Sequence, residues 1–273
     1  RGWKLILGQI DPGIIEEKLV HKIAQKYLKL QPKPDLLPLQ YWSNWREECR
    51  LADRIVVNSD WSRQALAKTG IEPDKITTIP LAYKATASKF KRTYPPRFTP
   101  KRPLKVLFLG QIIIRKGIGE ILEAITLLNK SINPALVEFW FVGEIKIKLS
   151  PKIKHYPQIK WLGSVSRNDT HNYYQQADIL LLPTHSDGFG LTQLEAQAWK
   201  LPIIASQFCG SVVKQQINGL ILPQITAREI VKSITFCLNN PQKLTDFSKN
   251  STQTLSKFSL NKLAQKITTI NIN

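Results

Sequence analysis

The sequence lacks several features that define other classes of protein. It contains no methionine among its 273 residues and only three cysteines, Cys49, Cys209 and Cys237, with no C-x-x-C pair. This pattern argues against a disulfide framework and a zinc site and is typical of a reducing compartment, so we expect a cytoplasmic protein. No apolar run approaches the roughly 18 residues that a membrane-spanning helix needs, and no signal peptide is recognisable.

The sequence also lacks recognisable metal-binding patterns. No D-x-D occurs, so no carboxylate pair is signalled that would hold Mg²⁺ across a diphosphate. The four histidines have no metal-ligand spacing either. We therefore expect neither a metal nor another cofactor.

Acidic residues are scarce. The chain has 39 Lys and Arg against 20 Asp and Glu, which gives a formal net charge of +19. Residues 84–105 carry eight basic residues and no acid, and Lys146 to Lys160 adds five lysines. A basic surface of this kind can meet nucleic acid, anionic lipid or phosphorylated ligands, or it can simply be a solvated face.

The first 84 residues predict a small α/β layer. Residues 14–29 have helical periodicity, and two short strands flank a helix over residues 60–70. Two strands cannot bury both faces of a sheet, so we interpret residues 1–84 as part of an N-terminal domain. Residues 85–103 carry four prolines without periodicity and are predicted to connect two domains.

From Leu104 the pattern becomes regular. Strands alternate with amphipathic helices to about residue 255, and the strands are nearly continuous apolar runs. This predicts an α/β fold with a parallel sheet covered on both faces. Ligands bind such sheets outside the carboxyl ends of the strands, at a topological switch point. A last helix over residues 256–273 is expected to pack back on the N-terminal domain.

The loop GQIIIRKG, Gly110 to Gly117, follows the first strand of this second domain. It is neither a P-loop nor a dinucleotide fingerprint. Gly110 allows close approach of a ligand, and Arg115 with Lys116 would place positive charge beside it. Cations at a helix N-terminus oppose the helix dipole, so either a bound anion explains them or the segment is an ordinary turn.

The stretch THSDGFGLTQLEA follows a later strand in the same way. Its glycines, Gly188 and Gly190, allow a turn after which the N–H groups of the next helix point back into the crevice. A diphosphate fits such a helix terminus, with Asp187 and Glu195 as acceptors for hydroxyl groups.

Helix capping is an alternative explanation of this stretch. Thr192 and Glu195 have the spacing of a capping box, and Asp187 is a residue that favours turns. The residues alone leave both interpretations open.

The run from Ala177 to Ser206 resembles the signature of family-4 glycosyltransferases, the glycosyl transferases group 1. That signature has two acids eight positions apart around Gly-Phe-Gly, as Asp187 and Glu195 are here, although the first acid is usually Glu. The Gly110–Gly117 loop resembles the family's G-R-x-x-x-x-K-G loop, with Gln111 where arginine is common. Further segments match in order, so the resemblance covers nearly the whole chain.

The resemblance implies a GT-B architecture of two facing Rossmann-like domains. Residues 104–255 would form the complete C-terminal domain that binds the nucleotide sugar, and residues 1–84 part of the acceptor-side N-terminal domain. The family retains anomeric configuration, usually without a metal, so we expect transfer of a hexose-type sugar from a UDP-, GDP- or ADP-sugar. Family members have a longer N-terminal domain, so we expect an N-terminally truncated sequence.

The resemblance also assigns roles to residues. Lys116, with Gln111 or Arg115 beside it, would bind the donor diphosphate, and Glu195 would bind the ribose hydroxyls. Asp187 would be the catalytic residue that contacts the transferred sugar. The backbone around Gly190 would bind the second phosphate. The other predicted members of the donor site are Gly110, Gly188, Phe189, Leu191 and Thr192.

Two other classes of function remain as alternatives. A non-catalytic nucleotide-sugar-binding remnant or partner subunit fits the truncation and the two departures from the motifs. A nucleic-acid-binding protein is not favoured, because the sequence has no RNP-type or helix-turn-helix signature. The acceptor, a sugar, a lipid or a glycan, is not defined by the sequence, and the basic segment over residues 85–103 can contact an anionic membrane peripherally at its inner surface. Cys209 is expected to be a buried structural residue rather than a nucleophile.

Overall fold

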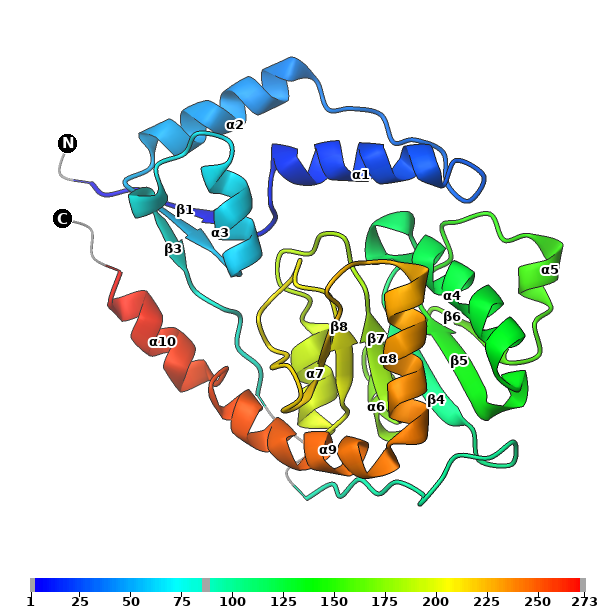
Figure 1. The fold of residues 1–273 in the computed structure, drawn as a ribbon. Helices are drawn as coiled ribbons and strands as arrows, with labels where there is room; N and C mark the ends of the chain where they lie inside the picture. Colours follow the sequence, from blue (N-terminus) through cyan, green and yellow to red (C-terminus); the bar gives the residue numbers. More distant parts are fainter. Residues whose placement is uncertain (1–2, 85–88, 271–273) are drawn as a thin grey trace.

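The computed structural model describes residues 3–84 and 89–270, which fold into two α/β units (Figure 1). The N-terminal layer is a parallel sheet of order β1-β2-β3. Its strands are β1 (Ile6–Gln9), β2 (Arg54–Val57) and β3 (Ile76–Thr78). Its helices are α1 (Ile14–Lys26), α2 (Leu39–Leu51), α3 (Asp60–Ala67) and the short η1 (Pro73–Lys75).

The sequence predicted only about two strands for this layer, and β1 is the one that it missed. The side chains of β1 alternate between exposed and half-buried, so it has no continuous apolar run. Ser59 caps α3 by accepting a hydrogen bond from Ser62 N. Trp42 and Trp45 of α2 pack into the core of the layer.

The second unit contains a six-stranded parallel sheet, as predicted. Its strands are β4 (Leu104–Leu109), β5 (Val137–Val142), β6 (Ile159–Gly163), β7 (Ile179–Leu182), β8 (Ile203–Ala205) and β9 (Gly219–Ile221). Their spatial order is β6-β5-β4-β7-β8-β9. This is the doubly wound Rossmann order, in which the direction of winding reverses between β4 and β7.

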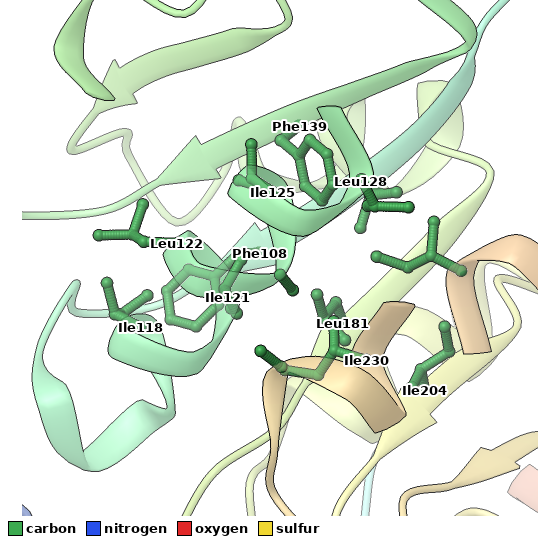
Figure 2. Close-up of a cluster of buried hydrophobic side chains, with 14 of the residues drawn as sticks. Phe108, Ile118, Ile121, Leu122, Ile125, Leu128, Phe139, Leu181, Ile204 and Ile230 are labelled. Atoms are coloured by element: carbon green, nitrogen blue, oxygen red, sulfur yellow. The ribbon is translucent and has the colours of Figure 1, made fainter. Parts of the chain in front are cut away.

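Helices cover both faces of this sheet. On one face α4 (Ile118–Ser131) and α8 (Ala227–Asn239) pack against strand residues such as Phe108, Phe139 and Leu181 (Figure 2). On the other face α6 (Thr170–Gln176) and α7 (Thr192–Ala198) cover the alternate strand residues. The remaining elements are η2 (Ile114–Lys116), η3 (Pro134–Leu136), α5 (Pro151–Lys154), α9 (Pro241–Ser256) and α10 (Leu260–Thr268).

Residues 89–103 run along the six-stranded domain, and part of their positive charge is used there. The Arg92 guanidinium donates to the backbone carbonyls of Tyr174, Ala177 and Trp199. Arg102 forms a two-pronged ion pair with the buried Asp178, with both N···O distances at 2.7 Å. These two arginines therefore hold the connection in place and are not part of a free basic surface.

The chain returns toward the N-terminal layer at its end (Figure 1). Leu81 and Tyr83, which lead out of that layer, pack with Leu255 of α9 and with Phe258, which follows α9. Tyr83 N also donates to Phe258 O at 2.9 Å. The helix α10 itself has no fully buried side chain, so the buried contacts of this part of the chain are made by the segment before α10. Among the described residues, no helix has the length and apolar character needed to cross a bilayer.

Candidate functional site

The two predicted motifs meet at the switch point of the six-stranded sheet. The strands β4 and β7 are neighbours, and the chain leaves them toward opposite faces, to α4 and to α7. The loops over residues 110–117 and 183–191 therefore diverge from one point, which is where ligands bind in sheets of this kind.

Backbone contacts join the two loops into one unit. Arg115 O accepts hydrogen bonds from His185 N at 2.9 Å and from Thr184 Oγ1 at 3.3 Å. Gly117 has a φ of 77°, and a Cβ there would lie 2.1 Å from Pro183 O. Only glycine therefore fits at this junction, which explains the glycine at the end of the motif.

Lys116 and Asp187 form an ion pair across the two loops. Lys116 Nζ contacts Asp187 Oδ2, and the two side chains are only 16% and 18% exposed. The predicted diphosphate-binding cation and the predicted sugar-binding carboxylate are thus direct neighbours. In a site screened from water, this contact is stronger than a surface ion pair.

Arg115 makes a second charged contact beside this pair. Its Nη1 donates to Ser186 O at 2.5 Å and lies 3.6 Å from Glu16 Oε2 on α1. Ser186 Oγ donates to the same Glu16 oxygen at 2.5 Å, and Trp61 Nε1 donates to Ser186 Oγ at 3.0 Å. The acids that balance the two cations before α4 thus come from the chain itself, Asp187 and Glu16.

The electrostatics of Glu16 reflect its position between the two units. Burial raises the pKa of this carboxyl, and Arg115 and the Ser186 hydroxyl offset part of that rise. The ionised form of Glu16 is therefore less favourable at this position than in water.

The N-terminal layer closes directly over the Asp187–Gly190 turn. A Cβ on Gly188 would lie 1.7 Å from Ile10 O, in the connection between β1 and α1. The glycine is required here because another backbone passes over it, which the sequence could not show. In Figure 1, α1 then runs on from the N-terminal layer toward α4.

Glu195 does not form the capping box that was the alternative explanation. The helix α7 begins at Thr192, its N-cap residue is Leu191, and no side chain caps it. Instead, Glu195 Oε2 accepts a hydrogen bond from Tyr174 Oη at 2.6 Å. Burial and the Glu195 charge raise the pKa of Tyr174, so this phenol stays protonated and holds the carboxylate in one orientation.

The other predicted donor-site residues have different surroundings. Gly110 has a φ of 141° and ends β4, while Gln111 is exposed and is not among the described contacts that join Lys116, Arg115 and Asp187. The Phe189 ring is buried in the cluster under α7 and α9, so a contact from this residue to a ligand is a backbone contact. Gly190 follows with a φ of 74°.

Sequence reasoning missed four residues of this site. Glu16, Trp61, Ser186 and Tyr174 have no motif of their own, and Glu16 is 170 positions from Ser186. Ser186 lay inside the recognised stretch, which is the one signal that was available. Cys209 is buried, and burial raises the pKa of its thiol to about 12, so it is structural as expected. Within residues 3–84 and 89–270, no group of three or more His, Cys, Asp or Glu could hold a metal ion.

The chain is similar to known glycosyltransferases. An uncharacterized glycosyltransferase of Haemophilus influenzae is 27% identical over 71% of this chain and 60% of its own length. N,N'-diacetylbacillosaminyl-diphospho-undecaprenol alpha-1,3-N-acetylgalactosaminyltransferase of Campylobacter jejuni is 22% identical over 91% of this chain and 68% of its own length. The chain thus spans about two thirds of these relatives, and 44% of a third, from Methanocaldococcus jannaschii.

The fold is also that of solved structures. HepE of Anabaena, crystallised with UDP and glucose, superposes with a TM-score of 0.72 at 16% identity, over 97% of this chain and 70% of HepE. The GT-B type of the α/β fold is therefore confirmed. The model of the family described as "Glycosyl transferases group 1" matches residues 91–254, which include both motif loops and more than half of the chain. The chain belongs to the glycosyl transferases group 1 family.

Proposed function

We propose that this protein transfers a hexose-type sugar from a nucleotide-diphosphate sugar with retention of configuration. The observation that carries the proposal is the cluster at the switch point, where two cations and the carboxylate Asp187 meet beside the Gly188–Gly190 turn. A UDP-sugar is the favoured donor among UDP-, GDP- and ADP-sugars, because the similar HepE structures contain UDP or UDP-glucose.

In this proposal Lys116 exchanges Asp187 for the donor diphosphate. Its ammonium group, with Arg115 beside it, stabilises the negative charge that develops on the leaving diphosphate. The exchange frees the Asp187 carboxylate to accept a hydrogen bond from a hydroxyl of the transferred sugar. Because positive side chains supply the charge and the sequence has no D-x-D, we propose metal-independent transfer.

The nucleoside end of the donor lies near Glu195 in this proposal. The ribose hydroxyls donate to the Glu195 carboxylate, which the Tyr174 hydroxyl orients through its hydrogen bond. The backbone N–H groups around Gly190 and Leu191 bind the second phosphate. Arg115 supplies the charge that the family motif places at Gln111, since the Gln111 side chain is exposed.

The acceptor is proposed to be a sugar, a glycan or a lipid-linked glycan. The name of the Campylobacter jejuni relative includes a diphospho-undecaprenol-linked sugar. Peripheral contact with an anionic membrane on the cytoplasmic side fits the basic residues that the fold leaves exposed, such as Lys91 and Lys101.

A thermal-shift screen against UDP, GDP and ADP, each alone and as a sugar conjugate, tests the donor site. A ligand that binds only the folded state raises the melting temperature, so we expect UDP and UDP-sugars to do so. Arg115→Ala should weaken UDP binding, because a charge beside the diphosphate is lost. No response to any nucleotide, together with tight binding of duplex DNA at physiological salt, would replace this proposal with nucleic-acid binding.

A non-catalytic donor-binding protein is the second candidate. The observation that favours it is the shorter carboxylate of Asp187, which is held by Lys116. Release of free sugar from UDP-glucose separates the two candidates, because a binding remnant gives a thermal shift without turnover.

A further inference from the structure

A pocket of about 560 Å³ lies between the N-terminal layer and the six-stranded domain. Its walls come from the β1–α1 connection, from α1 and α2, and from the loop over Ile113–Arg115. Arg115 belongs both to this wall and to the cation group at the switch point. The pocket is therefore adjacent to the proposed donor site, on its N-terminal side.

The pocket has the opposite charge to the molecule as a whole. Within the described part of the chain, Arg115 is the one basic side chain that lines it, although the chain has a net charge of +19. Carboxylates line it at five positions, Asp11, Glu16, Glu17, Asp35 and Glu48. An anionic ligand would lose its hydration here and meet like charges, which is unfavourable.

Several nitrogen donors of the wall are already used within the protein. Trp42 Nε1 donates to Glu17 Oε2 at 2.9 Å, and Trp45 Nε1 donates to Gln9 Oε1 at 3.0 Å. Gln9 Nε2 donates in turn to Asp11 Oδ1 at 2.8 Å, and Arg115 donates to Ser186 O. Glu17 accepts at both oxygens and Asp11 at Oδ1, whereas the carboxylates of Asp35 and Glu48 accept no hydrogen bond among the described contacts. A ligand therefore binds these acids with its own donors, hydroxyl or ammonium groups.

Three aromatic residues, Tyr41, Trp42 and Trp45, also line the pocket. Trp42 packs edge-on against Tyr41 and Trp45, with ring centroids 5.0 Å and 5.6 Å away. Tyr41 keeps 52% of its surface exposed. The exposed Tyr41 ring offers an apolar face to the C–H side of a sugar ring while the carboxylates accept from its hydroxyls, whereas Trp42 and Trp45 are buried behind it in the core of the layer.

We infer that this pocket takes the acceptor as a polyhydroxylated ring without negative charge, an uncharged sugar or an amino sugar. It rejects a ring that carries a carboxylate or a phosphate. The inference rests on the proposed function, because it identifies the second substrate of the same reaction. The inferred charge of the acceptor ring differs from what the basic composition of the chain suggests, because a basic chain by itself favours anionic partners.

Three methyl β-glycosides that share one ring test the charge rule: glucoside, glucosaminide and glucuronide. Each is titrated into the ¹⁵N-labelled chain with saturating UDP, and the indole N–H signals of Trp42 and Trp45 are followed. We expect the first two to shift these signals and the glucuronide to bind about fivefold more weakly, since an added charge is repelled at partly screened distances.

Glu48→Lys and Glu47→Lys are the matched variants. The two acids are adjacent and exposed on α2, but Glu48 lines the pocket whereas Glu47 pairs with Arg50. Glu48→Lys should remove most of the discrimination against the glucuronide, and Glu47→Lys should leave it unchanged. Equal effects of the two variants would show that general surface charge, and not the pocket, selects the ligand.

The donor site has a separate reporter in the Trp61 indole, which donates to Ser186. A protein whose Trp61 signal does not respond to UDP contradicts the proposed function. A protein that responds to UDP but binds the glucuronide as tightly as the glucoside, or shows no Trp42 and Trp45 shift with any glycoside, contradicts the pocket assignment alone.

Discussion

The six-stranded domain and the N-terminal layer face each other as two walls, which are built differently and carry opposite charge. The wall from the six-stranded domain presents Lys116 and Arg115 on the loop that follows the largely buried strand β4. The wall from the N-terminal layer presents Glu16 and other acids on elements of a three-stranded sheet, whose β1 leaves Ile6 46% exposed. Position along the fold, and not the net charge of the chain, thus decides which charges each wall presents.

The comparison also separates rigid from adaptable parts of the site. A parallel sheet that is covered on both faces fixes the ends of its strands, so the two cations are held where the diphosphate is proposed to lie. The acid wall rests on a smaller core, and its contact with the other wall runs through Glu16, Trp61 and the close approach of Ile10 to Gly188. We expect substitutions on the cation wall to have larger effects on donor binding.

The largest effect is expected for Asp187→Asn. This change keeps the size of the side chain but removes the charge that is proposed to contact the transferred sugar, so turnover of UDP-sugar should fall about 100-fold. The affinity for UDP should not fall, because Lys116 is released for the phosphates. Kinetics and UDP titration measure the two quantities, with the exposed Asp169→Asn as control. Unchanged turnover would exclude a catalytic role for Asp187.

Removal of the Lys116 charge should act on binding. Lys116→Ala is expected to raise the Kd for UDP about 30-fold, the scale of one charge-assisted hydrogen bond in a protected site. Lys130→Ala, an exposed lysine far along α4, controls for net charge. If calorimetry gives equal affinities for both variants, the cation wall does not bind the diphosphate.

Tyr174→Phe should have a smaller effect on the nucleoside end. Without the phenol, the Glu195 carboxylate loses the group that orients it, so UDP should bind about fivefold more weakly, within the range of one hydrogen bond. Binding of 2′,3′-dideoxy-UDP should not change, because it has no ribose hydroxyls to reach Glu195. The neighbouring Tyr173→Phe is the control, and a loss for both ligands would indicate a purely structural role for Tyr174.

The smallest effect concerns Glu16, where the two walls meet. Because burial raises the pKa of Glu16 above its usual 4.5, its ionised form is less favourable in the folded chain than in the unfolded one. That penalty is absent below pH 4.5 and complete above the folded-state pKa. Glu16→Gln should therefore match the native stability at pH 4 and exceed it at pH 7, by less than about 1 kcal/mol. Denaturant unfolding at the two pH values measures this, and a variant that is less stable at pH 7 would show that the Arg115 contact dominates.

Much of the six-stranded domain could be predicted from the sequence. The alternation from Leu104 onward specified a parallel sheet, and the loops after β4 and β7 were recognised as the positions for ligand-binding residues. The capping box at Thr192 and Glu195 was a local alternative that the sequence could not reject, because the same spacing serves both uses. In the structure no side chain caps α7, and Glu195 instead accepts a hydrogen bond from Tyr174, 21 positions away.

The sequence by itself determined the periodicities, the glycine turns and the identity of the side chains at the ends of the strands, because these depend on near neighbours along the chain. Only the tertiary structure decided which of those side chains meet. Lys116 contacts Asp187 across 71 positions and Ser186 contacts Glu16 across 170, and both contacts exist because β4 and β7 are neighbours and the N-terminal layer closes over them. Strand order and the docking of two units depend on the burial of whole faces, which no local pattern encodes.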